Sequence, residues 1–173
     1  GEDPTVNKLQ DLAAEITGKE AALLVSSGTM GNLVSLLTLT NRGEEIILGD
    51  QCHVYAWEGA GVPIFGGVSL SVIKNKSDGT LDLNDIKNAI NPIDDHKPST
   101  SVVSIENTQN QCSGSPISEE YLMALQDLCN VNKLKIHMDG ARLFNASVYL
   151  NIEASALTKH VDSVTFCLSK GLS

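Results

Sequence analysis

The sequence has few basic residues, few aromatic residues and no CxxC pair. Its 12 lysines and arginines stand against 21 acidic residues, which gives a formal net charge of −9. Nucleic-acid binding needs a basic face that neutralises phosphates, so this charge argues against a nucleic-acid partner. The sequence also lacks a basic run for a membrane surface and an apolar run of membrane-spanning length, which argues against a membrane partner.

The four cysteines are widely separated, so neither a zinc site of the usual spacing nor a disulfide framework is expected. Reduced thiols indicate a reducing compartment, and we expect a cytoplasmic location. The four histidines also lack the spacing of metal ligands, and we predict no catalytic metal. The length of 173 residues is enough for one domain with a full core.

Short apolar runs alternate with helical patterns along the chain. The helical patterns begin near residues 4, 29, 81 and 118. This alternation predicts an α/β fold of three layers, with a mostly parallel sheet between helices. The runs that we interpret as buried strands are 21–26, 45–48, 68–73, 101–105, 135–138 and 163–169.

Polar segments follow five of these predicted strands. Right-handed crossovers place the carboxyl ends of parallel strands at one edge of the sheet. Open α/β sheets bind ligands at that edge, so we expect the polar segments to converge on a site there. The segments are Ser27–Asn32, Asp50–His53, Glu106–Asn110, Asp139–Arg142 and Ser169–Lys170.

Lys170 follows the last predicted strand and is followed at once by Gly171. A lysine with apolar neighbours loses its proton more easily than a surface lysine, and its amine can form a Schiff base with an aldehyde. The alternative is a solvated lysine at a strand end. Gly28 and Thr29 stand where a helix begins, and free amide groups there suit a phosphate. The alternative is an ordinary helix cap.

Asp139 ends a predicted strand, where its carboxylate could hold a protonated ring nitrogen. Arg142 could bind a carboxylate with its guanidinium fork, although a local ion pair with Asp139 is the alternative. His53 could lie against an aromatic ring or act as an acid or base, or it could be a surface histidine. With Lys170 and the phosphate turn, these groups together indicate pyridoxal phosphate chemistry on an amino acid.

Four segments, GEDPTVNKLQ, SSGTMGN, HMDGARLFNA and FCLSKGLS, closely resemble the low-specificity L-threonine aldolases. These are fold-type I pyridoxal-phosphate enzymes, distantly related to the β-eliminating lyases. The resemblance implies that Lys170 holds the cofactor covalently and that Asp139 pairs with its ring nitrogen. It also implies that Arg142 lies near the substrate carboxylate and that His53 stacks over the ring and is a candidate base.

By the same resemblance, Gly28 and Thr29 bind the cofactor phosphate with help from Ser169. The family usually has ENTHN where this chain has ENTQN, so Gln109 replaces a second active-site histidine. An amide is not a general base at neutral pH. We therefore treat Gln109 as a substrate-contact position whose function is open, with water or His53 as the alternative base.

The implied reaction is cleavage of L-threonine or L-allo-threonine to glycine and acetaldehyde by a lyase. The alternatives are another pyridoxal-phosphate lyase acting by β-elimination, a racemase, or a catalytically degenerate domain because of Gln109. The resemblance further implies a homodimer or homotetramer. It also implies that residues 1–173 are the large cofactor-binding domain, a fragment that lacks an N-terminal segment and a C-terminal small domain.

Overall fold

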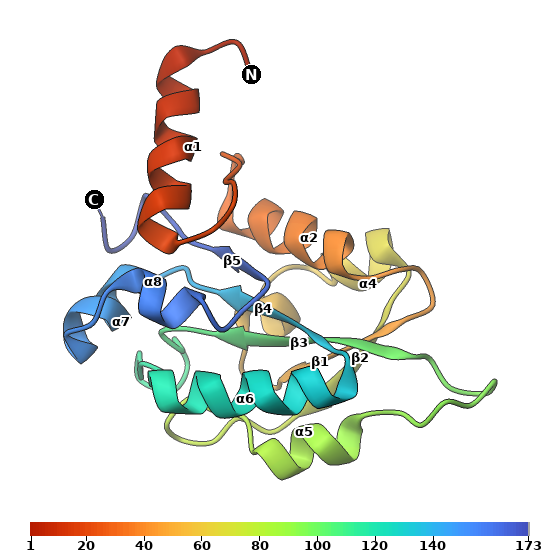
Figure 1. Ribbon diagram of the computed structural model, residues 1–173. Helices are drawn as coiled ribbons and strands as arrows, with labels where there is room; N and C mark the ends of the chain where they lie inside the picture. The colour runs from red at the N-terminus through yellow and green to blue at the C-terminus, as the bar shows by residue number, and fades with distance from the viewer. Residues whose placement is uncertain (173) are drawn as a thin grey trace.

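Five parallel strands form one sheet in the computed structural model, which describes residues 1–172 (Figure 1). The strand order is β2-β1-β3-β4-β5, and every neighbouring pair is parallel. Helices cover both faces, so the predicted α/β/α architecture is confirmed. The strands are β1 Glu45–Gly49, β2 Ser69–Ile73, β3 Thr100–Glu106, β4 Lys135–Asp139 and β5 Ser163–Thr165.

Two apolar cores lie on the two faces of the sheet. Ile46 and Leu48 of β1 pack with Leu36 beneath the helices of one face, whereas Ile47 packs with Leu122 on the other. This alternation follows the two-residue period of a strand buried on both sides. The helices are α1 Pro4–Thr17, α2 Gly28–Leu39, α3 His53–Ala56, α4 Gly61–Gly66, α5 Leu83–Ala89, α6 Glu119–Asn132, α7 Leu143–Leu150 and α8 Ala154–Thr158.

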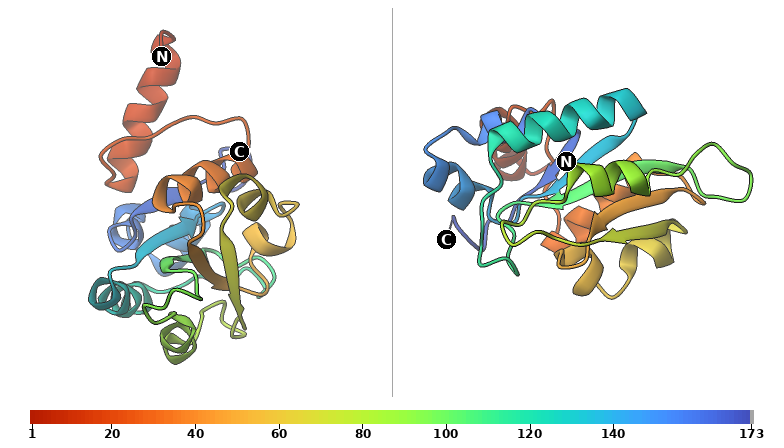
Figure 2. Two further views of the ribbon diagram at one scale, coloured as in Figure 1. Left: turned by 90° about the vertical axis from the view of Figure 1, so that its right-hand side faces the viewer. Right: turned by 90° about the horizontal axis from the view of Figure 1, so that it is seen from below.

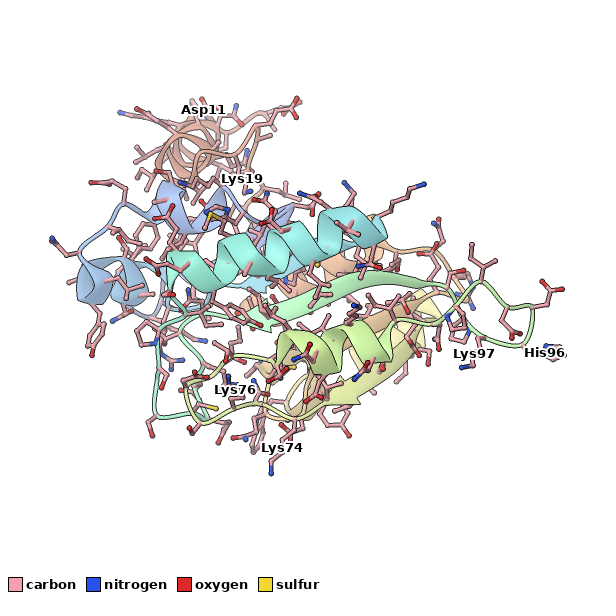
Figure 3. All side chains as sticks on the ribbon, turned by 60° about the horizontal axis from the view of Figure 1, so that its bottom comes forward. Asp11, Lys19, Lys74, Lys76, His96 and Lys97 are labelled. Carbon is pink, nitrogen blue, oxygen red and sulfur yellow. The ribbon has the colours of Figure 1, made fainter. Side chains whose placement is uncertain are left out.

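Side-chain caps explain where several helices begin. Asp3 accepts hydrogen bonds from the amides of Thr5 and Val6 at 2.8 and 3.0 Å, and Asp82 caps α5 in the same way. Helix α1 stands away from the sandwich (Figure 2). The loop between α5 and β3 projects away from the sheet, with His96 and Lys97 near its tip (Figure 3). In residues 1–172, no helix is both long and apolar enough to cross a bilayer.

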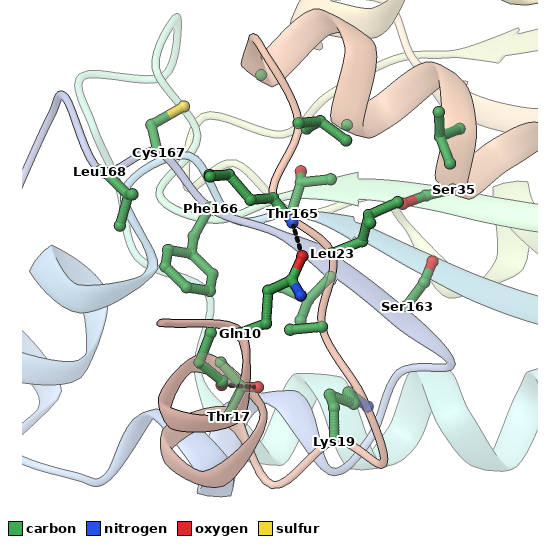
Figure 4. A pocket seen from close by; sticks show the side chains of 18 of the residues that line it. Gln10, Thr17, Lys19, Leu23, Ser35, Ser163, Thr165, Phe166, Cys167 and Leu168 are labelled. Carbon is green, nitrogen blue, oxygen red and sulfur yellow. Dashed lines mark hydrogen bonds between the residues drawn. The ribbon is translucent and has the colours of Figure 1, made fainter. Parts of the chain in front are cut away.

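Two predicted strands differ from the structure. The segment 21–26 is extended but unpaired, because a cavity of about 640 Å³ separates it from β5, where a ladder partner would lie (Figure 4). The amide of Leu24 bonds to the side chain of Gln10 instead. Strand β5 ends at Thr165, so Lys170 follows in a turn and not directly at the strand end. The glycine-rich segment after α3 also folds into the unpredicted helix α4.

The strand order changes direction between β1 and β3. From β1 the chain moves outward to β2, then returns to β3 and continues in the opposite direction to β4 and β5. The connections beyond the carboxyl ends of β1 and β3 therefore diverge, and ligands bind at such a point in open parallel sheets. The segments that follow β1 and β3 begin with Asp50 and Asn107.

Candidate functional site

A row of polar side chains crosses the carboxyl ends of three strands. Glu106 on β3 is paired in register with Asp139 on β4, which is paired with Thr165 on β5. Residues paired in this way project to the same face of a parallel sheet. Glu106 and Asp139 are both buried. The sheet register therefore places two buried carboxyl groups side by side under the helices of that face.

Asn32 of α2 connects this row to its surroundings. Its Nδ2 donates to Asp139 Oδ2 and to Glu58 Oε1, each at 2.8 Å. Its Oδ1 accepts from Thr165 Oγ1 at 2.6 Å and from His137 Nε2 at 3.1 Å. Both amide hydrogens and both oxygen lone pairs are thus used. Because carboxylates only accept, the nitrogen must face the two acids, and this contact fixes the orientation of the amide.

His137 lies two residues before Asp139 on the same strand and is fully buried. Its Nε2 must carry a proton to donate to Asn32, so Nδ1 accepts from the hydroxyl of Ser163, 2.8 Å away. Burial lowers the pKa of His137 to about 4, against the nearby negative charge of Asp139, which raises it. His137 is therefore neutral near pH 7 and orients Asn32 by donating a hydrogen bond.

The low pKa of His137 predicts how the free energy of unfolding depends on pH. Its pKa falls from 6.5 unfolded to about 4 folded, so acidification protonates the unfolded chain first. The free energy of unfolding should fall by up to about 3 kcal/mol as the pH drops through this window. Burial raises the pKa of Glu58 and Glu106, which acts in the opposite direction. Urea titrations between about pH 7 and pH 4 measure this change. In His137→Gln the free energy of unfolding should fall less steeply with pH than in the parent.

The exposed His96 supplies the control, because His96→Gln should leave the pH dependence of the parent unchanged. An identical acid-induced loss of stability in His137→Gln and in the parent would contradict the assignment of that loss to His137.

His53 opens α3 and is held at two points. Its backbone amide donates to Glu106 Oε2 at 2.8 Å, and its Nδ1 lies 2.8 Å from Glu58 Oε1. Glu106 Oε1 also accepts from the amide of Asn110 at 2.9 Å, so one carboxylate joins the segments after β1 and β3. The His53 side chain is 40% exposed and that of Glu58 only 2%. The imidazole of His53 thus lies at the surface of the site and contacts the buried carboxyl group of Glu58 beneath it.

The ligand atoms of His53, Glu58 and Asp139 lie within 4.8 Å of one another, which is compact enough for a metal ion. However, Asn32 directs its amide hydrogens at both carboxylates. A cation that approached this group would meet N–H donors, and hydrogen bonds already join the two acids. The cluster is therefore described better as a hydrogen-bonded network than as a metal site.

The amino end of α2 lies against the segment that follows β5. Ser27 caps the helix, and its side chain accepts from the amide of Met30 at 3.1 Å. The amides of Gly28 and Thr29 belong to the first turn, where a helix offers them no partner of its own. A Cβ atom on Gly28 would lie 3.1 Å from Cys167 Sγ, so the absence of a side chain permits this close approach.

Ser169 and Lys170 are exposed in the turn that follows Cys167. The next residue, Gly171, packs against α7, because a Cβ atom there would lie 2.0 Å from Asn145 Oδ1. These two close approaches hold the turn between the amino end of α2 and α7. The predicted phosphate turn and the predicted Schiff-base lysine thus belong to neighbouring segments.

Arg142 immediately precedes α7 and lines a separate cavity of about 500 Å³. In residues 1–172, Arg142 and Asp139 form no ion pair, and Asp139 Oδ1 instead accepts from the amide of Ala141 at 3.0 Å. Arg142 is half-buried, and Thr108 and Asn145 line the same cavity. Arg142 therefore borders this cavity and is not paired with the neighbouring acid.

Gln109 is fully buried in the loop after β3. Its Nε2 donates to the carbonyl of Gln51 at 2.8 Å, and its Oε1 accepts from the amide of Cys112 at 2.7 Å. The side chain therefore joins the loops after β1 and β3. Its role in substrate contact stays a prediction, since in this conformation both polar ends of the amide are bonded to the backbone.

We expect Gln109→Ala to lower the free energy of unfolding by about 2–3 kcal/mol, because the buried amide of Cys112 and the part-buried carbonyl of Gln51 lose their partners. Thermal unfolding followed by circular dichroism measures this loss. The neighbouring Gln111 is exposed and provides a matched control, for which Gln111→Ala should change stability by less than about 0.5 kcal/mol. Equal effects in the two variants would contradict a clamping role for Gln109.

Three residues of the network carry no role in the sequence-based prediction: Asn32, Glu58 and Glu106. The sequence indicates Asn32 only as the end of the phosphate turn and Glu106 only as the start of a polar segment. Glu58 follows His53 by five residues in a glycine-rich stretch, and this spacing alone does not indicate contact. The position of Glu106 at a predicted strand end was the one available signal.

Comparison with known proteins assigns the chain to a family. The family model of the β-eliminating lyases matches residues 1–173. The chain belongs to the β-eliminating lyase family. It is 45% identical over 178 residues to low-specificity L-threonine aldolase 1 of Arabidopsis thaliana, covering 99% of this chain and 49% of that protein. It is 45% identical over 172 residues to the low specificity L-threonine aldolase of Escherichia coli O157:H7, covering 99% and 51%.

Solved structures show the same fold. A protein from Listeria monocytogenes assigned as an L-allo-threonine aldolase matches with a TM-score of 0.87 at 24% identity, over 99% of this chain and 46% of the other. A threonine aldolase from Leishmania major matches with a TM-score of 0.75 at 23% identity, over 87% and 44%. The chain spans about half the length of the curated relatives. The family resemblance is confirmed, and threonine aldolases of this fold use pyridoxal phosphate.

Proposed function

We propose that the protein cleaves L-threonine and L-allo-threonine to glycine and acetaldehyde, with pyridoxal phosphate bound covalently at Lys170. The observation that carries this proposal is the buried carboxylate of Asp139, which Asn32 holds at the carboxyl edge of the sheet. The amino end of a helix and a lysine-bearing turn lie on neighbouring segments. The names of the curated relatives support the same reaction.

The described residues fit pyridoxal phosphate. Asp139 would hold the ring nitrogen protonated, because an adjacent carboxylate favours the positive form. The first-turn amides of Gly28 and Thr29 would bind the phosphate, with Ser169 as a further donor. His53 would lie against the ring. Bound pyridoxal phosphate supplies the electron sink that stabilises a carbanion at the substrate Cα.

The chain's own residues would orient the substrate and move its proton. Arg142 lines a cavity and would bind the substrate carboxylate with two parallel hydrogen bonds, which sets the direction of the Cα–Cβ bond. His53 would accept the proton of the β-hydroxyl group, with water as the alternative acceptor. Gln109 remains a proposed substrate contact from the loop after β3.

The proposal extends to assembly and location. Three large apolar side chains on and near α4 are more than half exposed: Trp57 at 64%, Ile64 at 66% and Phe65 at 67%. Such a group supports contact with a second copy of the chain, as a homodimer or homotetramer. Sedimentation equilibrium would measure the mass. A cytoplasmic location is proposed from the cysteines, all of which are free.

Product analysis tests the reaction. The protein is incubated with pyridoxal phosphate and separately with L-threonine, L-allo-threonine, L-serine and L-alanine. Equal amounts of glycine and acetaldehyde from both threonine isomers are expected. Pyruvate from serine, or D-alanine from L-alanine, without glycine from threonine would replace the aldolase with an eliminating lyase or a racemase. Absence of cofactor binding would overturn the proposal as a whole.

A further inference from the structure

Glu58 is a buried acid to which neither the fold nor the predicted chemistry assigns a role. It lies between α3 and α4, and its side chain is 98% buried beneath the half-exposed ring of His53. One oxygen, Oε1, contacts both His53 Nδ1 and Asn32 Nδ2 at 2.8 Å. The other oxygen, Oε2, is buried without a hydrogen-bond partner. Burial of a carboxyl oxygen without a hydrogen-bond partner lowers the free energy of unfolding, so a functional role would account for Glu58 at this position.

The hydrogen-bond network determines what Oε1 does. The carboxylate of Asp139 only accepts hydrogen bonds, so Asn32 turns Nδ2 toward it, and the same Nδ2 donates to Glu58 Oε1. With Glu58 ionised, Oε1 can only accept hydrogen bonds, and it accepts the one from Asn32. An acceptor 2.8 Å from His53 Nδ1 requires that this nitrogen carry a hydrogen.

We propose that Glu58 is a positioning residue that keeps His53 in the Nδ1-protonated form and leaves Nε2 as the nitrogen that accepts a proton. This inference rests on the proposed function in one respect. The group that gives its proton to Nε2 is then the β-hydroxyl group of the substrate. When Nε2 takes that proton, the imidazole becomes positively charged and its Nδ1–H group remains bonded to Glu58. Asn32 joins the same carboxyl oxygen to Asp139, so one network positions both residues.

Glu106 does not perform this function. It bonds to the backbone amides of His53 and Asn110 and therefore fixes where the chain runs, and the imidazole tautomer does not depend on it. Asp139, at the end of β4, bonds to Asn32 and to the amide of Ala141. In residues 1–172, the position of the His53 ring gives it one hydrogen-bond partner, Glu58. The role of Glu58 can thus be tested at a single atom.

The test is a two-bond ¹H–¹⁵N correlation spectrum of the ¹⁵N-histidine-labelled protein, at a pH where imidazole is neutral. No cofactor or substrate is added, so failure of this inference is distinct from failure of the aldolase proposal. His53 is identified by the signal that disappears in His53→Gln. A protonated Nδ1 and unprotonated Nε2 are expected in the parent, and a protonated Nε2 would overturn the proposal without any variant.

Variants then assign the effect to Glu58. Glu58→Gln keeps an acceptor at Oε1 and should retain the Nδ1-protonated form, whereas Glu58→Ala should shift His53 toward the Nε2-protonated form that free histidine prefers. Glu58→Met fills the same volume without an acceptor and replaces Glu58→Ala if alanine prevents folding. Glu45→Gln, a buried acid at the other end of β1, is the matched control and should change nothing. An unchanged His53 pattern in Glu58→Ala or Glu58→Met would overturn the assignment.

Discussion

Lys170→Ala is expected to lower the rate of glycine formation from L-threonine by at least about a thousandfold, because the amine that would bind the cofactor is lost. The absorbance band of the covalently bound cofactor should disappear from the spectrum of the same variant. Lys170 is exposed in a turn and not part of a core, so the variant should still unfold in one cooperative transition. Lys170→Ala should therefore lose activity while it remains folded.

Lys159 offers a matched control for this experiment. It is a surface lysine at the end of α8, and its amine pairs with Glu119 at 2.6 Å. Lys159→Ala removes a positive charge of the same kind but should retain the cofactor band and the full rate. A Lys170→Ala protein that keeps the band would show that another amine, or no amine, binds the cofactor.

Local chemistry explains why several helices could be predicted. Apolar residues recur at helical spacing in them, and caps such as Asp3 and Asp82 lie directly before the first helical residue and accept bonds from first-turn amides. Strand pairing depends on partners far along the chain, so a local sequence pattern does not show whether an extended segment joins a sheet. The segment 21–26 has the composition of a buried strand, but a cavity lies where its partner would be. Extended backbone becomes a strand only when a neighbour accepts and donates its hydrogen bonds.

In the site, too, local features can be predicted from the sequence, whereas contacts between distant residues cannot. Strand ends can be read from a sequence, and His53 and Asp139 were both expected at the carboxyl edge, where one network now joins them. Glu58 and Asn32 together join them, and Asn32 lies within the first half of α2, where it has the pattern of an ordinary helix position. Its bonds extend to residues 26 and 107 positions away in the sequence. Contacts over such distances come from the fold, and composition or spacing does not show them.

Asn32→Asp is the second change for which we expect a large effect. The substitution alters one atom group and hardly changes volume, but it replaces the donor that faces Asp139 and Glu58 with an acceptor. Two hydrogen bonds to buried carboxyl groups are lost, and three acidic groups then meet in one buried space. We expect the free energy of unfolding to fall by about 3–5 kcal/mol at about pH 8. Urea titration measures this loss.

Asn91 provides the matched control, since its Nδ2 also bonds a glutamate, Glu45, at 2.8 Å, but in a half-buried loop. Asn91→Asp should cost less than about 1 kcal/mol, because water can screen the new charge.

The pH dependence of Asn32→Asp distinguishes electrostatic repulsion from a packing defect. Crowded carboxyl groups have raised pKa values in the folded state, so the folded variant binds a proton that the unfolded chain still lacks. Stability relative to the parent should therefore recover as the pH falls from about 8 to about 5. A deficit that stays constant over this range would mean that the loss comes from altered packing. It would also mean that Asn32 does not act by separating the charges of Asp139 and Glu58.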